Sequence, residues 1–491
     1  MQPLRKGSGV DLTSCTLPEH RNSSTIRDMN LTFVARMVAV GVTVMVSSGC
    51  LSPSTVSSPS LTQSAENQPA QGLLATEVDT AQISDNLRLL ETAQPLRVRT
   101  CVVETERETK TGLGSLTGMF VDAGSGDFLA DRGAEISRPS ASVVKLFTAV
   151  AALRVLGADY TFTTGVVEGQ AGEIFLVGGG DVTLTRTPGR NYYNSSASLT
   201  SLANAAVGNA SPGTPLTIRA DGSRYEDFPE WDTSWRSGSA ALGFIAPVTA
   251  LQVDGDRDQP SVRLSPRSMN PESRATNWFA EALRVGAPDR QVVVGEPGRA
   301  PSDGRVVATV ESAPLEELVR IMLVDSDNSL AEVIAREIAL AQNETNIGAA
   351  IAEGRGGLAG VSIRGGSGLS ESTTIPHEEI ARLLIDINDD ESLSVLKESL
   401  PVAGETGSLR NRFLSVSGEL AGRIQAKTGS IRGTRSLAGY LEADDGSELV
   451  FSLNVTGPGV DNSSRDDIDR LLAEVSRCGS NLAHWESPDA K

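Results

Sequence analysis

The chain has 491 residues, which is enough for two or three domains of ordinary size, each with its own buried core. It carries 62 acidic and 43 basic residues, and this negative balance disfavours nucleic acid or an anionic membrane surface as a partner of the globular part. Only six residues are lysines, so nearly all of the positive charge is arginine.

The N-terminal region has the layout of an export signal. Residues 31–49 are mostly apolar and follow several basic side chains. The apolar core after Arg36 is short for a bilayer span, which favours a signal peptide over a permanent anchor. The segment ending at Cys50 resembles a bacterial lipobox, although Ser47 stands where a larger aliphatic residue is usual. We expect residues 1–50 to be an export signal or membrane anchor and the protein to lie in the bacterial envelope, with lipid attachment at Cys50 left open.

Residues 51–75 are rich in Ser, Thr, Pro, Gln and Ala, a composition typical of a flexible linker. Beyond it, Cys101 and Cys478 lie near the two ends of the globular part. Export would allow this pair to oxidise, so we favour a disulfide over two independent buried thiols.

Residues 116–130 alternate around a glycine-rich turn and predict a hairpin. From Ser142 to about Leu156 apolar residues recur at helical intervals, which predicts a buried helix that Ser142 opens. Residues 158–313 contain alternating β-type patterns, glycine-rich turns and most of the aromatic residues, and we interpret them as an inserted β-rich domain.

After the insert, apolar periodicity predicts three further helices and then three strands before a last amphipathic helix. The helices are expected at 314–324, 329–341 and 377–387, the strands at 424–430, 436–442 and 448–456, and the last helix at 466–477. Residues 76–157 and 314–491 would then form one catalytic domain that the insert interrupts.

Three short motifs lie on these elements in a fixed order. They are Ser-Val-Val-Lys from Ser142 to Lys145, Ser-Asp-Asn from Ser326 to Asn328, and Lys-Thr-Gly from Lys427 to Gly429. Each alone is common by chance: Ser142 could be an ordinary helix N-cap and Lys427 a solvated strand lysine. Together, in order and in suitable structural contexts, they predict an enzyme that forms an acyl-serine intermediate.

The first motif supplies a nucleophile and its base. Residues three apart on a helix share a face, so the amine of Lys145 can reach the hydroxyl of Ser142. A lysine accepts a proton from serine only when burial or a nearby positive charge lowers its pKa, and Lys427 could supply that charge. Unpaired N–H groups at the helix start, beginning with that of Ser142, can face the oxyanion of a tetrahedral intermediate.

The other two motifs supply substrate contacts. Lys427 and Thr428 suit a substrate carboxylate, and Gly429 removes a side chain that would block close approach. Ser326 can pass a proton to the leaving amine, and the amide of Asn328 can hold the substrate backbone.

The chain resembles the low-molecular-mass class C penicillin-binding proteins, the D-alanyl-D-alanine carboxypeptidase/endopeptidases. The three motifs are the signature of penicillin-binding proteins and class A β-lactamases, and the long insertion after the first motif argues against a simple β-lactamase. Further segments carry the same likeness, namely Gly178–Leu184, Ala246–Leu251, Gly366–Ser370 and Leu400–Gly404. One departure is Asp327, where many relatives have asparagine.

This resemblance implies an α+β fold, a serine DD-peptidase/β-lactamase-like antiparallel sheet flanked by helices and interrupted by the insert. It implies that Ser142 attacks the penultimate D-alanine of a peptidoglycan stem peptide ending in D-Ala-D-Ala, with Lys145 as base and Ser430 as second oxyanion donor. Water would release the acyl-enzyme, and β-lactams would inhibit it. We expect no cofactor and no nucleic acid partner, and membrane contact only through the N-terminal segment or a lipid.

Two rival functions remain as alternatives: a β-lactamase or esterase of the same fold, and a non-catalytic envelope lipoprotein that binds through the insert. The balance of carboxypeptidase and endopeptidase action is also open. Asp181 is interpreted as a turn-stabilising residue. The aspartates at 254, 256 and 258 only superficially resemble a calcium loop, so we predict no metal site.

Overall fold

The computed structural model describes residues 98–104, 115–189, 191–209, 215–358, 360–414 and 418–486. All of them belong to the compact unit Ala93–Lys491. The export signal, Cys50 and the linker expected at 1–75 lie outside the described residues. Within the described ranges, every helix is too short or too polar to cross a bilayer.

The main sheet has five strands in the order β11-β12-β13-β2-β3, and every neighbouring pair is antiparallel. Its strands are β11 (Ile424–Ile431), β12 (Thr434–Glu442), β13 (Glu448–Thr456), β2 (Ser115–Asp122) and β3 (Phe128–Arg132). The hairpin and the three C-terminal strands expected from the sequence are therefore confirmed. The central strands are buried along most of their length because helices cover both faces.

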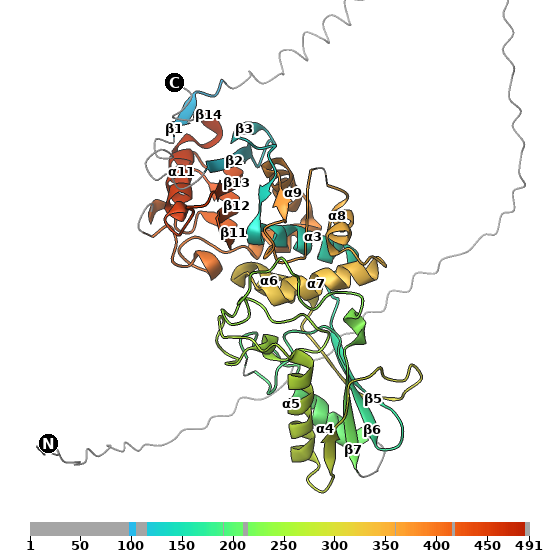
Figure 1. Ribbon diagram of the computed structural model, residues 1–491. Helices are drawn as coiled ribbons and strands as arrows, with labels where there is room; N and C mark the ends of the chain where they lie inside the picture. The colour runs from blue at the N-terminus through green and yellow to red at the C-terminus, as the bar shows by residue number, and fades with distance from the viewer. Residues whose placement is uncertain are drawn as a thin grey trace, which may run out of the picture. The chain divides into compact units, whose positions relative to one another are not determined.

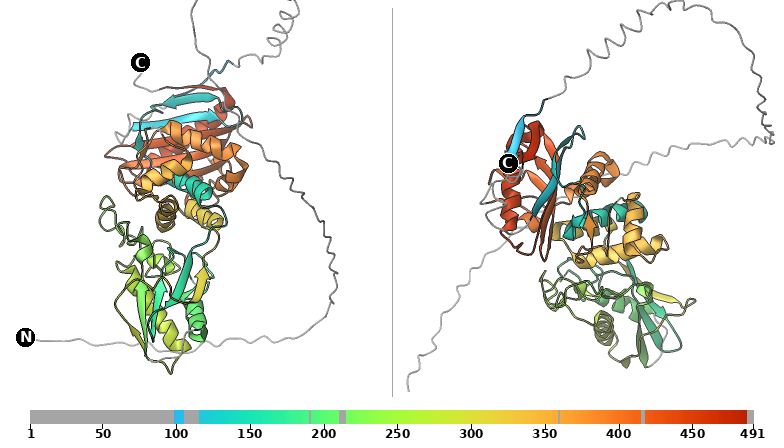
Figure 2. Two further views of the ribbon diagram at one scale, coloured as in Figure 1. Left: turned by 90° about the vertical axis from the view of Figure 1, so that its right-hand side faces the viewer. Right: turned by 45° about the horizontal axis from the view of Figure 1, so that its top comes forward.

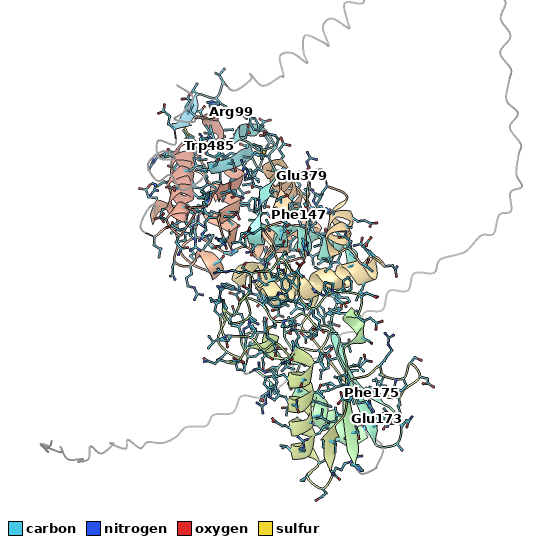
Figure 3. The ribbon with its side chains drawn as sticks, viewed as in Figure 1. Arg99, Phe147, Glu173, Phe175, Glu379 and Trp485 are labelled. Atoms are coloured by element: carbon cyan, nitrogen blue, oxygen red, sulfur yellow. A yellow bond between two sulfur atoms is a disulfide. The ribbon has the colours of Figure 1, made fainter. Side chains whose placement is uncertain are left out.

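Figure 1 shows α11 (Ser464–Cys478) on one face of this sheet and α9 (His377–Asp389) on the other. A layer of helices continues beyond α9. It comprises α3 (Lys145–Val155), α6 (Leu315–Asp325), α7 (Asn328–Ala341), α8 (Ile347–Arg355) and the short α10 (Ser394–Glu398). Helix α3 is apolar on nearly all sides, as expected of a helix packed on every face, and Phe147, labelled in Figure 3, is fully buried on it.

The insert builds a second five-stranded sheet in the order β8-β7-β6-β5-β9. Its strands are β5 (Thr163–Glu168), β6 (Glu173–Val177), β7 (Leu216–Asp221), β8 (Val292–Val294) and β9 (Val306–Glu311). Figure 2 shows these strands together with two helices, α4 (Leu199–Asn209) and α5 (Pro271–Gly286), which share their hydrophobic core.

The sequence predicted the β-structure of the insert but neither of its two helices. The reason lies in strand direction, because β6–β7 and β7–β8 are parallel pairs. Parallel neighbours need a long crossover connection, usually helical, and α4 and α5 lie in those two connections.

The two ends of the described chain are joined. Strand β1 (Cys101–Glu104) pairs in parallel with β14 (Leu482–Glu486), and a disulfide links Cys101 to Cys478 with their Cα atoms 5.6 Å apart. The predicted disulfide is thus confirmed. Trp485 packs edge-on against Phe120 of the main sheet, and Figure 3 labels Trp485 near Arg99 at this end.

The conspicuous aspartates of the insert have structural contacts. Asp181 accepts hydrogen bonds from the backbone N–H and the hydroxyl of Thr183 at 2.7 and 2.6 Å, which confirms its turn-stabilising role. Asp254 accepts from the hydroxyl of Thr185 at 2.8 Å. Among the described residues, no three histidine, cysteine or acidic side chains are grouped so as to hold a metal ion.

Candidate active site

Ser142 lies in a single 3-10 turn, Ala141–Val144, and the α-helix proper begins at Lys145. The expectation that Ser142 opens the α-helix is therefore off by one turn. In a 3-10 turn, side chains three positions apart eclipse one another, so this turn brings the side chains of Ser142 and Lys145 closer together than an α-helix does. Ala141 has a φ of +47°, a left-handed conformation that is strained for a residue with a side chain and is typical of functional sites.

The amine of Lys145 is fully buried and all three of its donors are used. Its Nζ lies 3.1 Å from Ser142 Oγ, 2.8 Å from Asn328 Oδ1 and 2.6 Å from the carbonyl oxygen of Ser367. Burial lowers the pKa of Lys145 to about 7, against the opposing pull of nearby carboxylates. A substantial fraction of this amine is thus unprotonated at neutral pH.

Of the two causes that the sequence suggested for a lowered pKa of Lys145, burial is the one that acts. A positive charge on Lys427 is not among the causes of the shift. The influence runs the other way, because burial and then the charge of Lys145 hold the pKa of Lys427 well below its ordinary value.

Lys427 joins the third motif to the second. Its Nζ lies 2.8 Å from Ser326 Oγ and 3.0 Å from the carbonyl oxygen of Thr428. Ser326 occupies the junction of α6 and α7 with a φ of +57°. Asn328 begins α7, and while its Oδ1 accepts from Lys145, its Nδ2 donates to the carbonyl oxygen of Phe244 in the insert at 3.0 Å.

Strand β11 is an edge strand, and hydrogen bonds define which of its residues face outward. Outside the sheet, the carbonyl of Ile424 accepts from Ala403 N and the N–H of Ala426 donates to Pro401 O. Because backbone direction alternates along an antiparallel strand, the N–H groups of 428 and 430 also face away from β12. The Ser430 N–H therefore faces the open edge, the direction that an oxyanion donor needs.

Gly429 lies where the sheet touches the turn that holds Ser142. A Cβ at this position would lie 2.0 Å from Ser436 Oγ, 2.8 Å from Ser140 O and 3.0 Å from Ala141 Cβ. Ser436 Oγ donates to Ser140 O at 2.8 Å, so β12 is bonded directly to that turn. The absent side chain allows strand and turn to approach, and the hydroxyl of neighbouring Thr428 donates to Ser408 Oγ at 2.7 Å.

The structure thus joins Lys145 to Ser142 and Asn328, and Lys427 to Ser326, by direct hydrogen bonds. The two sets meet at the second motif, where Ser326 and Asn328 are two positions apart. The remaining predicted residues, at 428 to 430, follow Lys427 on the same edge strand.

Sequence reasoning missed the residues that support Lys145. Ser367, whose carbonyl accepts from the lysine, is held by Glu332, which accepts from its N–H at 3.0 Å and its hydroxyl at 2.6 Å. Glu332 in turn pairs with Arg336 at 3.2 Å one turn along α7, and both side chains are buried. The available signal was two opposite charges four residues apart in a largely apolar helix.

A second omission is Asp327. The sequence marked it only as a departure inside the middle motif, yet its carboxylate is buried and paired with Arg257 of the insert at 3.1 Å. Nothing local in the sequence identifies that partner.

A serine whose hydroxyl contacts a buried, deprotonatable amine, with a second lysine and an asparagine beside it, defines a serine acyl-transfer enzyme. Penicillin binding protein 4 from Haemophilus influenzae has the same fold, with a TM-score of 0.62 and 18% identity over 74% of this chain and 95% of that chain. The fold class expected from the sequence is therefore confirmed.

Sequence comparison defines the family. The D-Ala-D-Ala carboxypeptidase 3 (S13) family model matches residues 105–268 and 251–476. Carboxypeptidase DacB of Mycolicibacterium smegmatis is 35% identical over 387 residues, covering 75% of this chain and 81% of that protein. A carboxypeptidase of Mycobacterium tuberculosis is 32% identical over 386 residues, with the same coverage. The chain belongs to the S13 family of D-Ala-D-Ala carboxypeptidases, and it is a serine-type hydrolase among the low-molecular-mass class C penicillin-binding proteins.

Proposed function

We propose that the enzyme cleaves the terminal D-Ala-D-Ala bond of peptidoglycan stem peptides through an acyl-enzyme on Ser142. The observation that carries this proposal is the 3.1 Å contact between Ser142 Oγ and the amine of Lys145. Burial lowers the pKa of that amine to about 7, which suits a base that must accept a proton at neutral pH.

In the acylation step, Lys145 takes the hydroxyl proton as Ser142 Oγ bonds to the carbonyl carbon of the penultimate D-alanine. The carbonyl oxygen becomes an oxyanion, which the backbone N–H groups of Ser142 and Ser430 stabilise. Loss of one such donor typically lowers the rate on the order of a hundred- to a thousand-fold.

The tetrahedral intermediate then collapses. The bond between the carbonyl carbon and the nitrogen of the terminal D-alanine breaks, and Ser326 donates a proton to that nitrogen. Ser326 regains a proton from Lys427, to which it is hydrogen bonded at 2.8 Å. The proton that Lys145 took from Ser142 passes to Lys427 and replaces the one given to Ser326, so Lys145 is again neutral. Lys145 then takes a proton from water as the water oxygen bonds to the ester carbon, and it returns that proton to Ser142 Oγ as the ester bond breaks.

Substrate binding uses the edge strand and α7. The terminal carboxylate of the stem peptide binds Lys427 and the hydroxyl of Thr428. Its negative charge favours the protonated form of Lys427, whose pKa burial holds low in the free enzyme. The amide of Asn328 contacts the peptide backbone, and Gly429 leaves room for the chain to lie along β11.

Penicillin provides the direct test, because a β-lactam is attacked by the same serine. One relative by fold, penicillin binding protein 4 from Haemophilus influenzae, has been crystallised in complex with a β-lactam. We expect mass spectrometry of the penicillin-treated protein to place one adduct on the peptide that contains Ser142. An adduct on another residue would contradict the assignment, and rapid release of the adduct would favour a β-lactamase.

We also propose a domain organisation and a route to the envelope. The catalytic domain comprises residues 76–157 and 314–491, the insert 158–313, and residues 1–50 and 51–75 an export signal or anchor and a linker. Lipid on Cys50, or the apolar segment 31–49, would attach the enzyme to the membrane. Mass analysis of protein purified from membranes, compared with a Cys50→Ala variant, would reveal the lipid by its added mass.

A further inference from the structure

Besides the hydrogen bond from Asn328 to Phe244, a buried ion pair joins the insert to the Ser-Asp-Asn motif. Arg257 Nη2 lies 3.1 Å from Asp327 Oδ2, and the two side chains are 0% and 4% exposed. Tyr193, also in the insert, donates its hydroxyl to the same oxygen at 3.0 Å. Asp327 is the middle residue of the Ser-Asp-Asn motif, so the insert bonds to the residue between two proposed catalytic side chains.

Both carboxylate oxygens of Asp327 accept hydrogen bonds. Oδ1 accepts from the N–H of Leu330 at 3.0 Å and so caps the N-terminus of α7, while Oδ2 faces the insert. On one side of Asp327 the backbone of Ser326 is left-handed, and on the other Asn328 starts the helix. Because a left-handed serine persists only where its surroundings enforce it, the anchoring of Asp327 fixes the directions of both neighbours.

Arg257 is itself held in place. Its guanidinium donates to the carbonyl oxygens of Asp254 at 3.2 Å and Arg263 at 3.3 Å, and it stacks over the rings of Tyr192 and Tyr193 at 4.7 Å each. The three residues before it, 254 to 256, have φ values of +57°, +56° and +60°. Residue 255 is a glycine and adopts this conformation freely, but Asp254 and Asp256 are strained by it, and backbone strain of this kind is concentrated at functional sites.

We propose that Arg257 and Tyr193 are positioning residues for acylation, holding Ser326 and Asn328 in their working geometry through Asp327. The inference rests on the proposed roles of Ser326 and Asn328. It makes the insert part of the catalytic machinery, because a side chain 70 positions away from Asp327 completes the motif.

The charges of Arg257 and Asp327 also influence the pKa of Lys145, the proposed base. The charged groups that face Lys145 are Asp327 and Glu332 of the α7 region, whose negative charges raise its pKa, and Lys427 of β11. Arg257 offsets the charge of Asp327. If Arg257 is removed while Asp327 stays ionised, the pKa of Lys145 rises and acylation requires a higher pH. If Asp327 is neutralised instead, the pKa of Lys145 falls and acylation extends to lower pH.

The test compares Arg257→Met, Asp327→Asn and the double variant by the rate of labelling with fluorescent penicillin across pH. For Arg257→Met we expect a rate at pH 7 that is lower by at least about tenfold, which corresponds to about 1.4 kcal/mol in the barrier, and a midpoint shifted to higher pH. Asp327→Asn shifts the midpoint to lower pH. The double variant should be more stable than Arg257→Met, because it removes the buried carboxylate that Arg257→Met leaves without its ion-pair partner.

Arg219→Met is the matched control, since it removes another insert arginine that pairs with Glu173 at 2.5 Å and does not contact α7; Figure 3 labels Glu173 in the insert. It should label like the wild type. Tyr193→Phe removes only one hydroxyl, and it keeps the test available if Arg257→Met does not fold; its labelling should also slow.

Equal rates and midpoints in folded Arg257→Met and wild type, or in Tyr193→Phe and wild type, would overturn the positioning role. Absence of label on Ser142 in the wild type would instead overturn the proposed function. The two failures are therefore distinguishable.

Discussion

The amine of Lys427 lies 2.8 Å from the hydroxyl of Ser326, although 101 positions separate the two residues in the chain. The contact joins an edge strand to a junction of two helices. A second contact, from Lys145 to Asn328, spans 183 positions and joins that junction to the turn that carries the nucleophile. Three separate stretches of sequence thereby form one hydrogen-bonded site.

Replacing Ser142 with alanine should abolish labelling by penicillin while leaving the fold intact, because the side chain is small and only partly buried. Gel fluorescence after incubation with labelled penicillin measures this, with circular dichroism as a check on folding. Ser125→Ala, in an exposed turn of the main sheet hairpin, is the matched control and should label normally. Persistent labelling of Ser142→Ala would refute the assignment of the nucleophile.

Acylation should depend on pH through Lys145. Because burial lowers its pKa to about 7 and only the neutral amine accepts a proton, the rate should rise as pH increases through about 7. Rates of labelling by penicillin, measured between about pH 5 and about pH 9, would show this rise. Lys145→Ala should acylate at least a hundred-fold more slowly, on the order of a general base contribution.

Lys397→Ala removes another lysine, one that pairs with Glu448 at 2.8 Å, and should keep the wild-type pH profile. A wild-type rate that does not change with pH in this range would argue against Lys145 as the base.

Adding one methyl group at Gly429 should impair acylation. The new Cβ would lie 2.8 Å from the backbone oxygen of Ser140, so β11 and the nucleophile turn must move apart. We expect Gly429→Ala to fold and to label at least about tenfold more slowly, since small misplacements of reacting groups have large kinetic effects. Gly208→Ala, where nothing lies within 4 Å of the added atom, should label normally. Identical labelling rates in the two variants would mean that acylation does not need the close approach of β11 to the turn that carries Ser142.

Reduction of the Cys101–Cys478 bond should destabilise the protein. The bond closes a loop of 377 residues and so constrains the unfolded chain, and loss of a disulfide typically lowers the free energy of unfolding by roughly 2–4 kcal/mol. Urea unfolding with and without reductant measures the difference. In Cys478→Ala the reductant should have no further effect, and an unchanged midpoint in the wild type would contradict the expectation.

Local patterns in the sequence predicted the elements that carry the site. The apolar periodicity after Ser142, the junction at Ser326 and the strand at Lys427 are each legible within a dozen residues, and the structure contains all three. The residues that surround Lys145 were not predictable in this way. The burial that lowers its pKa comes from elements distant in sequence, and Ser367, whose carbonyl oxygen contacts the amine, lies 222 positions away.

The insert was harder to predict for a related reason. Its helices follow from a parallel strand order, which is a property of the assembled sheet and not of any one segment. The importance of Asp327 was missed because a single aspartate in the sequence does not reveal a buried partner. Arg257 could not be singled out either, because arginine supplies most of the positive charge of this chain.

The disulfide and the parallel pairing of β1 with β14 have a mechanical consequence. A pulling force applied to the chain ahead of Arg99 first meets β1, and the sulfur bridge at Cys101 passes it directly to the end of α11. The load is thus carried by a covalent link before it can peel strands from the main sheet. We expect such a force to leave the spacing between Lys427 and Ser326 unaltered.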